Sequence, residues 1–281
     1  MVQDNHFFPG VPRTLWKNRV NKPVMLGTNH DEMAYREVRT QRINITTYTK
    51  SFAEIELISR YASFFQNQAR PTLDALEGVY LDHGSNTSDD EHLNILKFVV
   101  DAETTWFFTG PAGEEVSYYL QNNNPNVYLY EFTYASYLNN LTHTYPGYNP
   151  VVHGAQSEYV GMGYSSWLRS QADGKINATD IAIANFFGET WTNFAKFGKP
   201  TLDDTWKPVK SSGLTSMEYM EIGANIGMRT GYRTNDRTQY ETAALMAGQN
   251  RPQTPKDVIT SSATLLLNPT LDMFVDRILE T

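Results

Sequence analysis

Two short apolar segments, far apart in the sequence, most constrain the fold of this chain. After Pro23, the apolar run at residues 24–26 is stopped by Gly27, as in a short buried strand. Residues 126–134 are rich in Val, Tyr and Phe and predict a second strand. Residues 216–222 alternate in polarity and predict a third. Strands separated by long helical patterns indicate an α/β fold, in which helices cover a mostly parallel sheet.

Helical spacing of apolar residues fills much of the sequence between these strands. It predicts helices at residues 52–65, 71–81, 91–108, 112–121 and 179–197. Gly110 and Pro111 are expected to break the third helix from the fourth. Residues 135–176 are expected to be mostly loop, and a loop of that length inside a compact domain is usually functional.

The predicted sheet is small for the length of the chain. Three strands in 281 residues suggest a part of a larger fold. Residues 1–249 are interpreted as one portion of a domain. Residues 250–281 are interpreted as a C-terminal tail that is partly disordered and contains a short helix, because they are rich in Pro and Thr before an apolar end.

Composition and charge exclude several classes of protein. The formal net charge of -8 argues against a nucleic-acid partner, because phosphate binding needs clustered Lys and Arg. The absence of Cys excludes a disulfide framework, a thiolate metal site and a Cys nucleophile. No apolar run reaches the ~18 residues of a membrane span, and the N-terminus lacks the pattern of a signal peptide.

Four glycosylation sequons point to an extracellular or secretory location. Their acceptors are Asn44, Asn86, Asn140 and Asn177. A chain this rich in Asn and Thr also forms such triplets by chance, so both explanations stay open at this point.

Glu32 is a candidate catalytic residue because it follows the first predicted strand closely. In open α/β sheets, ligands bind beyond the carboxyl ends of the strands. A carboxylate placed there can accept the ring N–H of a catalytic histidine and orient it. The alternative is a solvated helix start, since acidic residues favour helix N-termini.

His153 is the second candidate, because it lies with Gly154 in the long predicted loop. It is otherwise a structural loop histidine. Asp101 interrupts an apolar helical pattern, and the sequence leaves open whether it is a buried structural carboxylate or a surface residue.

Other chemistries find little support in the sequence. The six histidines show neither a His-Glu-x-x-His motif nor an i, i+4 pair, and no Gly-rich phosphate loop is present. We therefore expect no metal and no cofactor. The Gly-x-Ser-x-Gly elbow that exposes a serine nucleophile is also absent; Gly163-Tyr-Ser-Ser166 comes nearest and lacks the closing Gly.

Five segments, taken in order, resemble the type B carboxylesterase and cholinesterase family. They are Val24-Met-Leu-Gly-Thr-Asn-His-Asp-Glu-Met33, Asn126-Val-Tyr-Leu-Tyr-Glu-Phe132, Val152-His-Gly-Ala-Gln156, Glu189-Thr-Trp-Thr-Asn-Phe-Ala-Lys-Phe-Gly-Lys-Pro200 with Trp206-Lys-Pro208, and Met217-Glu-Tyr-Met-Glu-Ile222. The resemblance implies the C-terminal half of an α/β-hydrolase. It also implies that Glu32 is the acid and His153 the base of a Ser-His-Glu triad, and it favours these roles over the structural alternatives.

The chain departs from the family pattern at three places. Met33 stands where the pattern has Gly. Gln156 stands where it has Glu, with Glu158 two residues later, so the surroundings of the histidine are in question. The family's nucleophile elbow and Gly-rich loop precede the acid, yet the 31 residues before Glu32 contain no serine.

The resemblance implies a hydrolase of small-molecule carboxylic esters that works through an acyl-enzyme. This chain alone is expected to be inactive, because it lacks the serine. One alternative is a non-catalytic adhesion protein similar to neuroligins, and another is a truncated gene product without independent function. The residues Trp106, Phe107, Phe108 and Trp167 are either walls of a substrate pocket or ordinary core.

Overall fold

The computed structural model describes residue 6 and residues 15–39, 43–81, 88–138 and 143–246. All of them belong to one compact unit, residues 1–248. The predicted tail at residues 250–281 lies outside the described residues, as do the sequons at Asn86 and Asn140.

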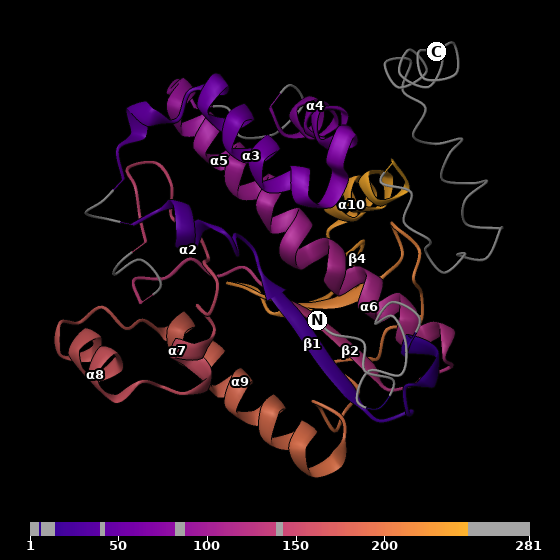
Figure 1. Cartoon of the computed structure of the whole chain (residues 1–281). Helices are drawn as coiled ribbons and strands as arrows, with labels where there is room; N and C mark the ends of the chain where they lie inside the picture. The colour runs from indigo at the N-terminus through magenta and orange to yellow at the C-terminus, as the bar shows by residue number, and fades with distance from the viewer. Residues whose placement is uncertain (1–5, 7–14, 40–42, 82–87, 139–142, 247–281) are drawn as a thin grey trace. The chain divides into compact units, whose positions relative to one another are not determined.

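The described strands form a single sheet in the order β1-β2-β3-β4 (Figure 1). They are β1 (Val24–Asn29), β2 (Val127–Phe132), β3 (Glu218–Ile222) and β4 (Gly227–Thr230). The first three are parallel, and β4 pairs with β3 antiparallel. The three predicted strands and the mostly parallel sheet are therefore confirmed. The prediction missed β4, which is short and begins with a glycine.

Both faces of β2 are covered, because all of its residues are buried. Tyr128, Tyr130 and Phe132 point to one face, and Val127 and Leu129 to the other, as the period of two requires. Burial on both faces explains why β2 is apolar at every residue except Glu131 rather than alternating.

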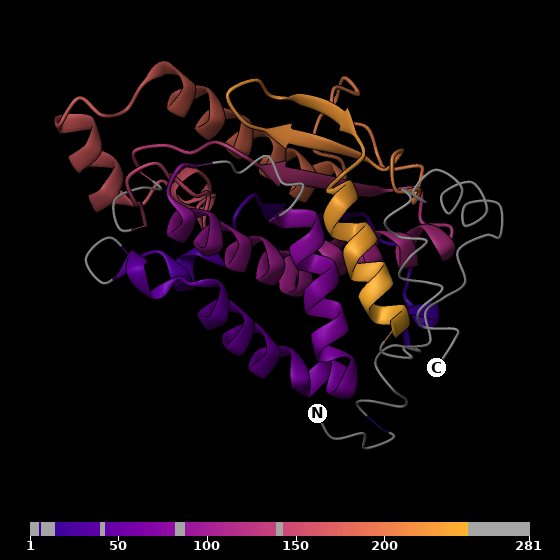
Figure 2. The same cartoon turned by 90° about the horizontal axis from the view of Figure 1, so that it is seen from above.

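Helices lie on both sides of the sheet (Figures 1 and 2). They are α2 (Ala34–Glu37), α3 (Lys50–Phe65), α4 (Ala69–Tyr80), α5 (Glu91–Thr104), α6 (Gly110–Gln121), α7 (Ser157–Val160), α8 (Tyr164–Ala172), α9 (Ala178–Phe197) and α10 (Thr234–Met246). The pictures show α9 on one side of the sheet, with α5, α6 and α10 on the other. This is the layered arrangement expected of an α/β fold.

Helix α9 begins and ends where the sequence predicts. Asn177 and Asp180 form a capping box at its start, and Gly198 ends it in the left-handed conformation with φ 70°. On its buried face, Phe187 contacts Phe132 of β2, with ring centroids 5.5 Å apart. The helix thus fixes one face of the central strand.

The predicted break at Gly110 and Pro111 is wrong, because the helix continues through it. A π-helical segment, η4 (Thr105–Thr109), joins α5 directly to α6. The Gly110 N–H donates to the Thr105 carbonyl, five residues back. Pro111 has no N–H to donate, and the wider turn accommodates its ring without ending the helix. Gly110 is needed here because a Cβ would lie 2.3 Å from the Tyr240 ring.

Most of the described residues within 135–176 lie outside helices and strands, as expected, but the segment is not entirely loop. Helices α7 and α8 lie within this segment, although both are short. Helix α10, which the sequence analysis missed, is strongly polar. Its buried Arg237 donates to the carbonyls of Ser212, Gly213 and Leu214, and its Tyr240 and Ala243 pack into the core, so contacts with distant residues hold this helix.

Candidate active site

Glu32 lies in the turn that follows β1, at the carboxyl end of the strand. Its side chain is buried, and the residue is 4% exposed. The Asn29 backbone N–H donates to Glu32 Oε1 over 2.8 Å. This contact folds the carboxylate back against the end of the strand and fixes one of its oxygens.

The segment that carries His153 is fastened to the same turn by backbone contacts. The Asp31 N–H donates to the Val151 carbonyl (3.0 Å), and the Val151 N–H donates to Asp31 Oδ2 (2.9 Å). The His153 N–H donates to the Glu32 carbonyl (3.0 Å). Residues far apart in the sequence are therefore brought together because β1 and β2 are parallel and adjacent.

Glu32 and His153 form a direct side-chain pair. Glu32 Oε2 lies 2.7 Å from His153 Nδ1, and the side chains are 6% and 54% exposed. A carboxylate at this distance favours a proton on Nδ1, which leaves the Nε2 lone pair free to accept a proton. Burial raises the pKa of Glu32, and the hydrogen bonds from Asn29 and His153 oppose that rise.

Aromatic rings flank the histidine. The Phe108 ring, from η4, lies 5.0 Å from the His153 ring, and the Tyr35 ring lies 5.5 Å away. Tyr35 did not stand out in the sequence. Of the other predicted pocket candidates, Trp106 and Trp167 are buried in the core, whereas Phe107 is 37% exposed.

The side-chain amides of Asn29 and Gln156 contact each other beside the segment that carries His153. Asn29 Nδ2 donates to the Val152 carbonyl and to Gln156 Oε1, each over 2.7 Å. Glu158 does not take the place of Gln156 in these contacts, because it accepts a hydrogen bond from Ser166 Oγ over 2.6 Å. That serine lies in the sequence nearest to a nucleophile elbow, and here it belongs to helix α8.

A separate ionic network surrounds the neighbouring histidine, His30. Its Nδ1 lies 2.9 Å from Glu131 Oε1, and Arg233 also donates to that oxygen. Partial burial opposes the charged ring, but the hydrogen bond to Glu131 and the charge of Asp31 outweigh it and raise the pKa of His30 to about 9. A raised pKa favours the charged form of His30, which suits an ion pair with Glu131 rather than a proton-accepting base. Sequence reasoning missed Glu131 and Arg233, which lie far from the motif.

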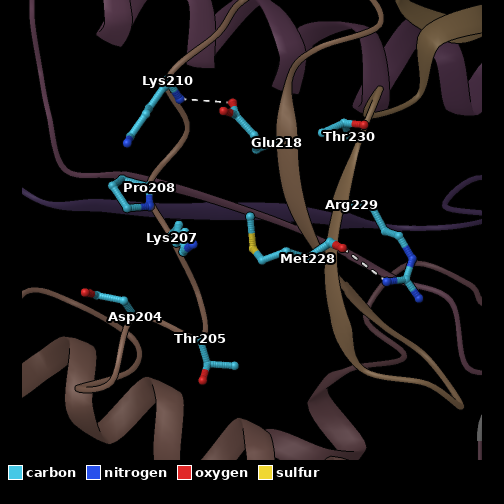
Figure 3. A pocket seen from close by; sticks show the side chains of 9 residues that line it. All are labelled: Asp204, Thr205, Lys207, Pro208, Lys210, Glu218, Met228, Arg229 and Thr230. Atoms are coloured by element: carbon cyan, nitrogen blue, oxygen red, sulfur yellow. Dashed lines mark hydrogen bonds between the residues drawn. The ribbon is translucent and has the colours of Figure 1, made fainter.

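One surface hollow lies apart from this pair. A cavity of about 730 Å³ is lined by the 204–210 segment, by Glu218 of β3 and by residues 228–230 of β4 (Figure 3). Glu218 accepts the backbone N–H of Lys210 and so fixes one wall. Neither Glu32 nor His153 contributes to its lining.

Metal binding and membrane insertion are two further possibilities for the described residues. Within the described ranges, no three His, Asp or Glu side chains converge in a way that would hold a metal ion. Among the described helices, none has the length and apolar character to cross a bilayer.

An acid after one parallel strand and a histidine after the next, joined by a hydrogen bond at the carboxyl ends, define an α/β-hydrolase arrangement. Comparison with known proteins agrees with this class. Residues 1–240 match the Carboxylesterase family, and the chain belongs to that family.

A curated human protein shows a more distant similarity. Bile salt-activated lipase (Homo sapiens) is 25% identical over 244 residues, which make up 83% of this chain and 30% of the lipase. The chain thus spans less than a third of the length of this relative.

Proposed function

We propose that this chain carries the acid and base of a serine-type carboxylic ester hydrolase. The observation that supports this most is the 2.7 Å contact between Glu32 Oε2 and His153 Nδ1, next to an exposed imidazole edge. A non-catalytic adhesion protein would have no need for this contact, because partner binding does not require an oriented base. Membership in the Carboxylesterase family and the similarity to a protein named a lipase support small-molecule esters as the substrate class.

Each residue of the pair has a defined role in this proposal. His153 Nε2 accepts the proton of a serine hydroxyl as that oxygen attacks the ester carbonyl, and it returns the proton to the leaving alcohol. Glu32 holds the imidazole in the Nδ1–H tautomer and stabilises the imidazolium that forms. When the acyl-enzyme is hydrolysed, His153 Nε2 accepts a proton from the attacking water and delivers it to the departing serine oxygen.

The nucleophile and the oxyanion hole are proposed to come from a segment outside these 281 residues. The sequence contains no Gly-x-Ser-x-Gly, and its nearest serine candidate lies in helix α8. The chain spans 30% of the related lipase, which leaves ample length for the remaining parts of such a site.

We further propose that the protein follows the secretory route. The sequon residue Asn44 is exposed, and its Oδ1 accepts a hydrogen bond from Thr46 over 2.8 Å. Asn177 is less suited to carry a glycan, because its side chain caps α9 and also donates to the Tyr134 hydroxyl.

The proposed pair can be tested by NMR on the chain itself. In 15N-labelled protein near pH 8, we expect His153 to be the Nδ1–H tautomer with a low-field Nδ1 proton, because Nδ1 faces the carboxylate. Glu32→Gln should weaken that signal, since an amide is a poorer acceptor than a carboxylate. A His153 ring protonated on Nε2 in the unaltered chain would refute the assignment of acid and base.

An ester assay tests the second part, the missing nucleophile. The purified chain should hydrolyse p-nitrophenyl acetate no faster than His153→Ala, because removing any member of a triad costs orders of magnitude in rate. Turnover that is well above background and lost in His153→Ala would show that the described site is complete without a further segment.

A further inference from the structure

The side chain of Asn29 connects several parts of the candidate site. Asn29 is 1% exposed at the end of β1. Its backbone N–H holds Glu32 Oε1, while its side-chain amide donates to the Val152 carbonyl and to Gln156 Oε1. Val152 immediately precedes His153, so one residue contacts the acid and also the segment that carries the base.

Gln156 completes this arrangement from the other side. Its Oε1 accepts from Asn29. Burial raises the pKa of the Tyr130 hydroxyl on β2, and the nearby Gln156 side chain opposes that rise. Because Gln156 starts α7, directly after the histidine segment, these contacts tie both ends of that segment to the sheet. An amide can accept at one end and donate at the other, which matches the two partners it meets here.

We infer that Asn29 and Gln156 form an amide clamp that positions His153 against Glu32. The inference rests on the proposed function, for which it supplies two positioning residues rather than catalytic ones. The geometry supports it in two ways. The clamp fixes the Val152 carbonyl, one peptide away from His153, and it joins Gln156, on the other side of the histidine, to the same residue of β1.

The clamp depends on the side-chain acceptor oxygen at position 156. Without it, one of the two Asn29 amide hydrogens loses its partner inside the fold, where an unpaired donor is costly. Asn29 would then turn to find another acceptor and release the Val152 carbonyl. A glutamate at position 156 keeps an acceptor for Asn29, so it should preserve the clamp although it adds a charge near Glu32.

The test compares Gln156→Met with Gln156→Glu in the 281-residue chain. Met has a similar length and no hydrogen-bonding amide, so it separates the acceptor oxygen from simple space filling. Gln171→Met is the matched control, because Gln171 is exposed near the end of α8. The readouts are the Nδ1 proton signal of His153, its tautomer, and the exchange rate of the His153 backbone N–H with solvent, with thermal unfolding as a check of the fold.

We expect Gln156→Met to lose the Nδ1 proton signal and to exchange the His153 N–H faster, while Gln156→Glu and Gln171→Met retain both. Retention of the signal in a folded Gln156→Met chain would overturn the clamp. Should Gln156→Met unfold, Gln156→Ala gives the same comparison with a smaller side chain. Absence of the His153 Nδ1 proton signal from the unaltered chain would instead count against the acid–base pair. Failure of the proposed pair can therefore be told apart from failure of the clamp.

Discussion

Asp101 of α5 should make the stability of this protein depend on pH. It is half-buried, and burial, followed by the nearby charge of Asp31, raises its pKa to about 7 from an ordinary value of 3.8. The folded chain therefore keeps a proton on Asp101 that the unfolded chain has already released. Keeping this proton stabilises the folded chain relative to the unfolded chain. The stabilisation is fully present below pH 3.8 and is lost as the pH rises through about 7.

The size of this effect follows from the two pKa values. A gap from 3.8 to about 7 corresponds to about 4 kcal/mol, at about 1.4 kcal/mol per pKa unit. Asp101→Asn mimics the protonated acid and does not titrate. Relative to the unaltered chain, it should be nearly neutral at pH 4 and more stable by about 4 kcal/mol at pH 8.

Urea unfolding at a series of pH values, followed by Trp fluorescence, measures this difference. Asp173→Asn is a suitable control, because Asp173 is exposed at the end of α8. A difference in unfolding free energy that stays constant from pH 4 to pH 8 would refute the reasoning. So would a variant that is less stable at pH 8, because the carboxylate would then be ionised and stabilised by Arg233.

Two further predictions concern the core and the sequons. Phe187→Ala should lower the unfolding free energy by about 3–5 kcal/mol in urea titrations, because Phe187 is fully buried, whereas Phe197→Ala, at a residue 58% exposed, should change it little. When the chain is expressed through a secretory route, treatment with a peptide N-glycosidase should reduce its mass. The variant Asn44→Gln should show a smaller reduction in mass. An unchanged reduction in Asn44→Gln would show that Asn44 carries no glycan.

The sequence predicted those parts of the fold whose signals are local. Strand β1 begins with an apolar run and β2 is apolar at every residue but Glu131, and α9 carries its own cap at Asn177 and its own stop at Gly198. Strand β4 was missed because it is short and begins with a glycine, and helix α10 was missed because contacts with residues far along the chain stabilise it. Arg237, a buried cation in a polar helix, satisfies carbonyl groups more than twenty residues earlier, and no local pattern reveals such a role.

In the candidate site too, the sequence identified residues with local signals but not the contacts that depend on the fold. Glu32 stood out because it follows a predicted strand, and His153 because it lies with Gly154 in a long predicted loop; the structure brings them to 2.7 Å. Asn29 was part of the quoted motif, but its contact with Gln156 depends on the pairing of β1 with β2, which no single segment encodes. The departure at Gln156 was visible in the sequence, while its hydrogen-bond partners were not.

In the π-helical segment η4, a change in chain length need not change the register of the flanking helices. A wide turn of this kind holds one residue more than an α-helical turn, so a single-residue deletion within Thr105–Thr109 would leave α5 and α6 in register, although it would remove the wider turn that accommodates the ring of Pro111. The same deletion inside α5 would rotate everything that follows by about 100° about the helix axis. Because η4 carries Phe108 to the ring of His153, insertions and deletions in this turn would alter the wall beside the histidine while the rest of the helix stays in place.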